Sequence, residues 1–481
     1  MTATPWTSAP PMPFEPPVSL DVDRQADAAV LAACAVAAVG VDLAVRSGIA
    51  GLAAASVPAA VCASLVATRR FPNPQARVLL ALAPVLTAFL AIRTSGVVVL
   101  PDILAAALLV ATAAGLARGG SLLDLTFPGL AGRLALTTTH GVLAPAFLLR
   151  PLGRLAAQRA GSWALVRGLA IGLPLVVVLT ALLASADAVF ASLLNLPDVA
   201  DLGLHVLLLA LGACAAATVL RQASARTADL PLGRAPALGR LESRIVLGGL
   251  CGVYTAFACT QVAVAAGAAD RILSEEGLTY AEYARQGFFQ LLAAAGLTAV
   301  VLLCVRAGGA LGDSASTVLV LLAVVLTEVV VAVAVHRLSL YEDAYGLTLL
   351  RLLAVAGALW VGAVFFLIGM AVAGAAPGRS WLPGAIGGAA LIALLGWNLA
   401  DPAALVARRN LDRAKPDAAY RAGLGDDAVP TIVARLPGLD PAIRADLVQR
   451  ICDAPHEART GPLEWNLAAT RATESRQALR C

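Results

Sequence analysis

Apolar runs of roughly twenty residues recur along most of this 481-residue chain and constrain its fold more than any other feature. A helix needs about 20 consecutive apolar residues to cross the hydrocarbon core of a bilayer. We count about eleven such runs, within a range of about 10 to 12. The sequence therefore predicts an all-α fold, a polytopic transmembrane helical bundle. The expected spans are Ala28–Val45, Ile49–Ala67, Val78–Ile92, Val97–Ala117, Gly168–Ala186, Leu202–Leu220, Ile245–Ala266, Gly287–Val305, Thr317–Val335, Leu347–Ala373 and Leu382–Leu399.

The composition supports lipid as the solvent of this chain. Hydrophobic residues make up 59% and charged residues 14%, and the mean hydropathy is +0.82. These values lie well outside the range of ordinary soluble domains. The formal net charge of +4 is modest and Lys415 is the only lysine, so we expect no nucleic-acid partner and regard the bilayer as the main one.

Three segments follow from these patterns. Residues 1–27 are proline-rich and predict a disordered N-terminal tail, residues 28–400 form the transmembrane domain, and residues 401–481 form a charged, helical C-terminal tail. Within that tail, Asp440 followed by Pro441 is typical of a helix start. One further helix is expected near Ala428–Leu436, and another after Pro462 with Trp465 on its apolar side.

One stretch, Ser121–Leu149, has scattered apolar residues around Arg133 and His140. We interpret it as an interfacial or re-entrant segment, with a twelfth span as the alternative.

The positions of basic residues predict the orientation. If the N-terminus is cytoplasmic, most loop arginines fall on the inner side and few on the outer side. An odd number of spans then places the C-terminal tail outside, whereas Arg408, Arg409, Arg413 and Lys415 at its start favour the inside. The span count carries slightly more weight. Cys452 and Cys481 could form a disulfide in an outer tail, although free thiols are the favoured expectation.

The stretch Gly277–Phe289, GLTYAEYARQGFF, is unusually polar for its surroundings. Thr279 and Glu282 have capping-box spacing, which predicts a helix that begins near Tyr280 and continues unbroken into the next apolar run. A second stretch, Ser339–Arg351, has a similar pair in Ser339 and Glu342 and is expected to begin the following span.

These stretches supply most of a candidate polar cluster at the outer membrane boundary. The favoured interpretation is an interfacial aromatic belt with bracing ion pairs, and the alternative is a ligand pocket or partner surface. The candidate residues are Asp187, Tyr280, Glu282, Tyr283, Arg285, Arg337, Tyr341, Glu342, Tyr345 and Arg351.

Glu328 lies near the middle of the expected span Thr317–Val335. A carboxylate at that depth costs about 2.5–3.5 kcal/mol on insertion scales, so it should face the bundle interior or a wet cavity. Two interpretations remain open: a proton- or cation-coupled site, and an internal hydrogen bond to a neighbouring helix.

No spacing typical of a catalytic triad, a phosphate-binding loop or a metal site occurs in the sequence. We therefore expect neither an enzyme, nor a cofactor, nor a bound metal.

Several stretches resemble the bacterial polytopic membrane proteins catalogued as domain of unknown function 4153/4173. They are LPLVVVLTALLASADAVF from Leu173, GLTYAEYARQGFF from Gly277, HRLSLYEDAYGLTLLRL from His336, WNLADPAALVARRNLDRA from Trp397 and GDDAVPTIVARL from Gly425. The resemblance covers roughly residues 80 to 470 and implies a multi-helix protein of the cell envelope, with no established activity to carry over.

Two functional classes follow. The first is a binding, sensory or scaffolding component of the bacterial cell envelope, located in the inner membrane, that engages an envelope protein or a small ligand. The alternative is a secondary transporter of a small solute coupled through Glu328, which is less favoured because the helix-breaking prolines are scattered and no long internal repeat is visible.

Overall fold

The structure is a computed structural model of the whole chain. It describes residues 26–157, 199–225, 239–264, 287–307, 314–375, 380–412, 423–454, 459 and 461–481, together with isolated positions between 168 and 190. Within these residues every regular element is a helix and no strand occurs. The predicted all-α helical bundle is confirmed.

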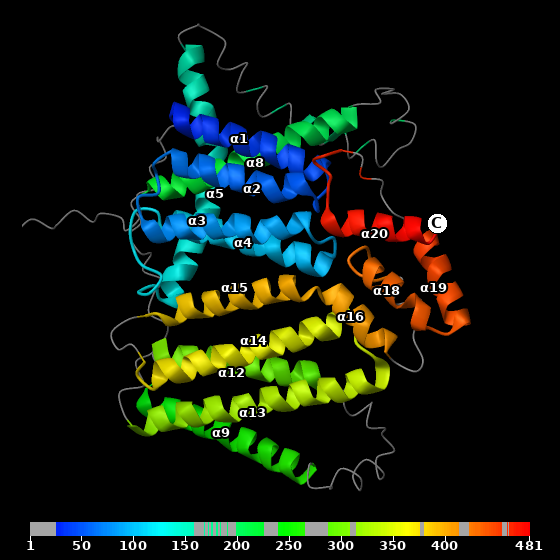
Figure 1. The fold of residues 1–481 in the computed structure, drawn as a ribbon. Helices are drawn as coiled ribbons and strands as arrows, with labels where there is room; N and C mark the ends of the chain where they lie inside the picture. Colours follow the sequence, from blue (N-terminus) through cyan, green and yellow to red (C-terminus); the bar gives the residue numbers. More distant parts are fainter. Residues whose placement is uncertain are drawn as a thin grey trace, which may run out of the picture.

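Ten of the expected spans correspond to described helices (Figure 1). Nine described helices are long and apolar enough to cross a membrane, and α2 is a shorter apolar helix. The expected span Gly168–Ala186 lies, except for isolated positions, outside the described residues. The helices are α1 (Ala28–Arg46), α2 (Leu52–Ala67), α3 (Pro74–Thr87) extended by η1 (Ala88–Ala91), α4 (Gly96–Leu116), α8 (Val199–Ser224), α9 (Arg240–Ala263), α12 (Phe288–Ala307), α13 (Ser314–Tyr345), α14 (Leu349–Val372) and α15 (Leu382–Ala400).

Helix α5 (Phe127–Ala157) crosses its neighbours instead of running beside them (Figure 1). Thr137 bonds to Gln222 near the end of α8, and Phe147, ten residues further along α5, lies under the guanidinium of Arg221. Ten residues of helix span about 15 Å, yet they meet adjacent residues of α8. Helix α5 therefore lies steeply across the end of α8, and it is not among the candidate spans. This arrangement agrees with an interfacial segment.

The helices form two packed groups. Helices α1 to α5 and α8 surround one apolar core that includes Leu65, Leu80 and Leu220. Helices α9 and α12 to α15 surround a second core that includes Leu302 and Phe365. Helix α15 of the second group packs against α4 of the first, so these two helices form a seam between the groups.

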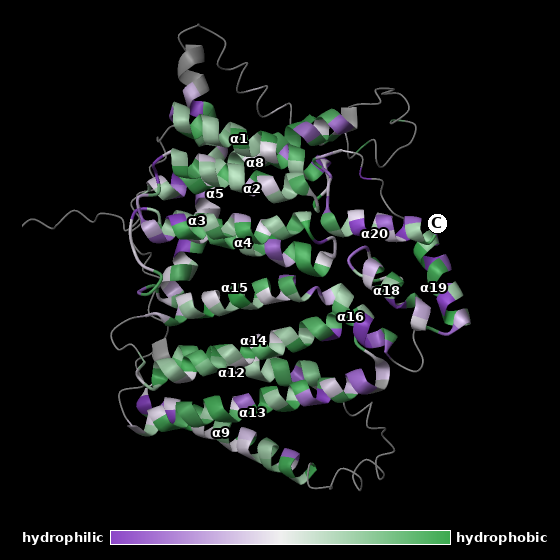
Figure 2. Cartoon of the chain, viewed as in Figure 1, coloured by the Kyte–Doolittle hydropathy of each residue, from purple (hydrophilic) through white to green (hydrophobic). Residues whose placement is uncertain are grey.

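The C-terminal tail is a small helical unit with its own core. Its helices are α16 (Pro402–Leu411), α18 (Val429–Arg435), η3 (Leu436–Gly438), α19 (Pro441–Asp453) and α20 (Leu467–Ala478). Asp440 accepts a hydrogen bond from the N–H of Ala442 and starts α19 as predicted. Asn466 starts α20, so Trp465 precedes this helix, and its expected place on the helical face is wrong. Figure 2 shows hydrophilic residues concentrated in this tail and at helix ends.

Hydrogen bonds to backbone groups hold the tail on one end of the bundle. Asp427 accepts from the N–H groups of Thr94 and Ser95 at 2.9 and 2.8 Å, and Asn466 donates to the carbonyls of Leu90 and Arg93. In the second group, the buried Asn410 bonds to both the N–H and the carbonyl of Leu347. The tail therefore connects loops of both helix groups.

Helix α2 has no side-chain N-cap of its own, and the tail supplies the missing acceptors. The carbonyls of Trp465 and Leu463 accept hydrogen bonds from the N–H groups of Leu52 and Ala53 at 2.9 Å. A Cβ at Gly51 would lie 3.2 Å from two carbonyl oxygens of this segment, so glycine permits the close approach. The first N–H groups of a helix need such partners.

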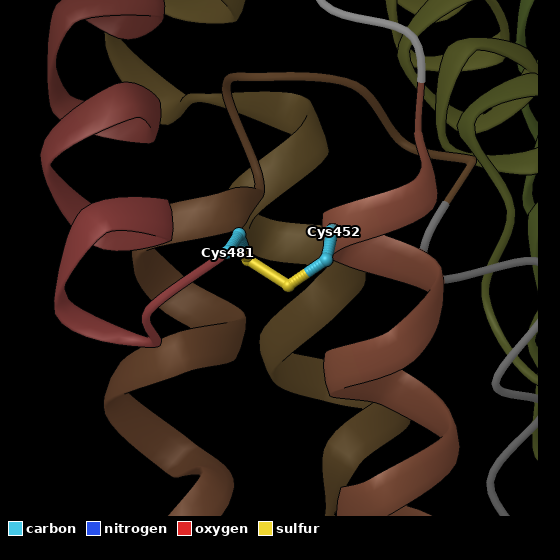
Figure 3. The surroundings of a disulfide bond; sticks show 2 residues. All are labelled: Cys452 and Cys481. Atoms are coloured by element: carbon cyan, nitrogen blue, oxygen red, sulfur yellow. A yellow bond between two sulfur atoms is a disulfide. The ribbon is translucent and has the colours of Figure 1, made fainter.

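Cys452 and Cys481 form a disulfide that joins the end of α19 to the chain three residues beyond α20 (Figure 3). The expectation of free thiols is wrong. Burial of Leu447 and Ile451 in the tail core turns Cys452 towards the end of α20, which the spacing of 29 residues in the sequence could not reveal.

Candidate functional site

Glu328 lies on α13 where this helix packs against α14. Its side chain is half-buried and faces Gly362, where a Cβ would lie 3.2 Å from the carboxylate oxygen Oε2. The carboxylate also reaches the backbone of Phe366 on α14. A larger residue at 362 would press on the carboxylate, so glycine at this position makes room for Glu328.

An open groove of about 790 Å³ extends from Glu328 along the two helices. On α13 it reaches Ser339, eleven residues or about 16 Å towards the tail. Its walls are mostly apolar, and His336 and Ser339 are exposed at its tail end. The lining residues are Glu328, Val331, Ala332, Val335, His336, Ser339, Leu359, Gly362, Ala363 and Phe366.

The groove ends at Glu328 in the other direction. Val324, one turn further along the same face of α13, is 6% exposed, and a Cβ at Gly369 of α14 would lie 3.3 Å from its Cγ1. This half of α13 packs into the second core. Glu328 is therefore the deepest polar group of a pocket with its mouth on the tail side.

Part of the expected outer cluster assembles beside this mouth. The rings of Tyr341 and Tyr345 lie 4.8 Å apart, and the guanidinium of Arg351 lies 4.3 Å from the centre of the Tyr341 ring. Arg351 also donates to the carbonyl of Gly346. A cation over an aromatic face is attracted by the ring quadrupole, so these three side chains brace the turn between α13 and α14.

The helix boundaries here differ from the expectation. Tyr341, Glu342 and Tyr345 end α13 instead of starting the next helix, which begins after Thr348. The Ser339 hydroxyl donates to the carbonyl of His336, so it does not cap a helix start. Gly346 has a φ of +86° and makes the actual break, since this backbone region favours glycine.

Arg337 lies on another face of α13 from the groove. It donates to Gln261 of α9 at 3.4 Å, and a Cβ at Gly287 would lie 3.0 Å from its Nη1. Gly287 has a φ of +97°, so α12 starts at Phe288 and the expected unbroken helix through this residue is wrong. Asp187, Tyr280, Glu282, Tyr283 and Arg285 lie outside the described residues.

A second intramembrane carboxylate, Asp102 on α4, was not anticipated from the sequence. It is fully buried, as is Asn398 on α15, whose Nδ2 donates to the Asp102 Oδ1 at 2.8 Å. Nearby, the Trp397 indole donates to the carbonyl of Val97, and Arg93 pairs with Asp401. These contacts join the two helix groups across the seam. The sequence feature that could have predicted this contact is Asp102 itself, an acidic residue inside an apolar run.

Asp427 in the tail is 6% exposed, and burial raises the pKa of its carboxyl above the ordinary value, although hydrogen bonds from Thr94 and Ser95 oppose this shift. Among the described residues, no group of three or more histidine, cysteine, aspartate or glutamate side chains is placed to hold a metal ion.

The apolar helices and the absence of strands in the described part define a class: this is a multi-pass integral membrane protein. The family model described as "Domain of unknown function (DUF4153)" matches residues 76–434, and the chain belongs to this family. The expected resemblance to domain of unknown function 4153 is thus confirmed, over a range that ends before the expected residue 470. No curated protein and no solved structure matches the chain.

Proposed function

We propose that this protein is a binding component of the bacterial cell envelope, located in the inner membrane, and that the Glu328 groove is its ligand site. The observation that carries this proposal is a single carboxylate at the closed end of an apolar groove with an open mouth. Pockets of about 300–1,000 Å³ with apolar walls and few polar groups are typical of small-molecule sites. The proposal includes no enzymatic reaction, no cofactor and no nucleic acid.

The chemistry of the groove indicates the class of ligand. Its apolar walls suit an apolar body, and Glu328 suits one amine or another hydrogen-bond donor. A carboxylate within the membrane needs a partner of this kind. Leu359 and Phe366 are 60% and 63% exposed on the outer side of the groove, so a ligand can enter from the bilayer as well as from the mouth.

We also propose that the N-terminus is cytoplasmic and the tail is on the opposite side. The end of the bundle away from the tail carries described arginines that include 69, 70, 77, 118, 133, 240, 244 and 306. The tail-side ends of the helices and the loop after η1 carry 46, 93, 337 and 351. Basic loops favour the cytoplasm. The basic residues at the start of the tail are only weak evidence against this orientation, because segments longer than about 60 residues cross the membrane largely regardless of charge. The disulfide suits an oxidising compartment.

A secondary transporter is the second candidate, and the position of Glu328 within the membrane is the observation that favours it. Transport also needs access from the other side. The close packing of Val324 against Gly369 beyond Glu328 favours binding over transport.

A fluorescent alkylamine tests the ligand site in proteoliposomes of the purified protein, with the alcohol of equal chain length as the uncharged comparison. The wild type should bind the amine saturably and the alcohol weakly. Glu328→Gln should lower amine affinity about 10- to 100-fold, because a hydrogen bond to a charged group contributes roughly 1.5–3 kcal/mol. Asp343→Asn, the same change on an exposed residue of α13, is the matched control.

Equal binding of amine and alcohol, or an unchanged affinity in Glu328→Gln, would contradict the ligand site. If the wild type instead accumulates the amine inside the vesicles under an ion gradient, and Glu328→Gln does not, the protein is a transporter and not a binding protein.

Single cysteines test the orientation. Glu474 on α20 and Arg69 after α2 are exposed and lie at the two ends of the bundle, so the variants Glu474→Cys and Arg69→Cys each place a thiol at one end. A membrane-impermeant maleimide applied to intact spheroplasts should label the first, and should label the second only after lysis. The reverse pattern would place the tail in the cytoplasm.

A further inference from the structure

A second cavity, of about 500 Å³, lies within the first helix group. It is surrounded by α1, α2, α3, α4 and α8, with Thr137 of α5 in its lining, and shares no residue with the Glu328 groove. Small side chains create the space, among them Ala54, Ala106, Ala215 and Ala216. Helices α1 and α8 touch so closely that a Cβ at Gly212 would lie 2.5 Å from the Ala37 carbonyl oxygen, and the cavity lies beside this contact.

The cavity is elongated along the helix axes. Its lining extends from Ala37 to Val45 on α1, continues to Ile49 in the loop after this helix, and extends from Ala54 to Leu65 on α2. The segment on α2 corresponds to about 16 Å. This is roughly half the thickness of a bilayer hydrocarbon core, or one leaflet. Val45 and Ile49 line its tail end and are 42% and 60% exposed, so the cavity opens near the membrane boundary.

The lining is apolar and its hydroxyls are already engaged. Thr87 donates to the carbonyl of Pro84, Thr137 bonds to Gln222, and Thr218 donates to the carbonyl of Cys214. None of the lining residues is charged. An apolar cavity of about 150 Å³ stays dry and binds benzene, so this one, about three times larger, suits a long hydrocarbon and neither water nor an ion.

We propose that this cavity binds one acyl chain of a bilayer phospholipid, whose head group stays at the tail-side boundary near Ile49. Three observations support this occupant. The long axis of the cavity is parallel to the spanning helices, its length matches one leaflet, and its opening lies among exposed apolar residues that face the bilayer. A free fatty acid is less suited, because Arg46, the cation next to Val45, is paired with Asp201.

Spin-labelled phosphatidylcholine tests the proposal in proteoliposomes of the full-length protein. The wild type should show a motionally restricted lipid population that saturates at a low lipid-to-protein ratio. Ala106→Phe should remove it, because Ala106 is a buried lining residue. Ala54→Phe should do the same from the opposite wall. Leu104→Phe, two residues from Ala106 but 61% exposed, should keep it.

The absence of a restricted population in the wild type would overturn the proposal without any variant. So would its persistence in both cavity-filling variants, or restriction of a spin-labelled fatty acid but not of the phospholipid. None of these results depends on Glu328, so a failure here leaves the proposed amine site standing.

Discussion

Two described carboxylates within spanning helices, Glu328 and Asp102, differ in how far the surrounding protein covers them. Asp102 is fully buried against the amide of Asn398 at the seam between the helix groups. Glu328 is half-buried at the end of an open groove, beside a glycine. A buried polar group with a fixed protein partner contributes to the architecture. One that faces an open groove is available to a ligand.

The comparison predicts first that Asp102→Ala is the more destabilising change. It removes one of the two acceptors of the buried Asn398 amide, and only the carbonyl of Leu394 remains. An unpaired buried N–H costs about 1–3 kcal/mol of unfolding free energy. Glu328→Ala removes a group beside an open groove and should change stability by about 0.5 kcal/mol or less. Denaturant unfolding in detergent micelles measures both. Equal losses would mean that Glu328 is a structural residue as well.

Most of the fold was predictable because the length of an apolar run alone predicts a span. The helix breaks were harder. Ser339 and Glu342 have the spacing of a capping box, but the apolar residues before them let α13 continue, and the Ser339 hydroxyl bonds back to His336. The breaks instead fall at Gly287 and Gly346, whose positive φ values are visible only in the folded chain.

The candidate site was predictable in part. Depth within a span singled out Glu328, but the groove needs Gly362, a residue of another helix. Asp102 and Asn398 are 296 residues apart, and no local pattern connects them. The tail contacts of Asp427 and Asn466 were unpredictable for the same reason, because their partners are backbone groups far away in the sequence.

Filling the groove should separate binding from stability. A leucine at Gly362 would extend towards the carboxylate, because a Cβ there already lies 3.2 Å from Oε2. Gly362→Leu should weaken alkylamine binding about tenfold or more, equivalent to about 1.4 kcal/mol. Gly357→Leu, on the same helix with nothing within 4 Å of its Cβ, gains the same side chain and should bind normally. Similar losses in both variants would refute the groove as the binding site.

Replacing both partners at the seam should restore what one replacement removes. Asp102→Leu and Asn398→Leu should each cost about 1–3 kcal/mol, whereas the double variant should remain within about 1 kcal/mol of the wild type, because no buried polar atom is left unpaired. A double-mutant cycle in micelles measures this coupling. Additive losses would show that the two residues contribute separately, and that the contrast with Glu328 does not rest on their pairing.

The smallest expected effect concerns Asp427, a buried carboxylate outside the membrane. It tests whether a carboxylate that is buried against hydrogen-bond donors of the protein stabilises the structure there as well. Burial raises its pKa above the ordinary value of 3.8, so ionisation is less favourable in the folded tail than in the unfolded chain. Its contribution to stability should therefore be fully present below about pH 3.8 and decline as the pH rises through the raised pKa. Asp427→Asn cannot ionise, so the stability of the wild type relative to this variant should fall over the same interval.

Hydrogen exchange of the Thr94 and Ser95 amides, which donate to Asp427, measures the stability of the docked tail locally. If the stability of the wild type relative to Asp427→Asn instead grew with pH, the hydrogen bonds from Thr94 and Ser95 would lower the pKa of Asp427 more than burial raises it. Asp427 would then bind the loop chiefly as an ionised carboxylate.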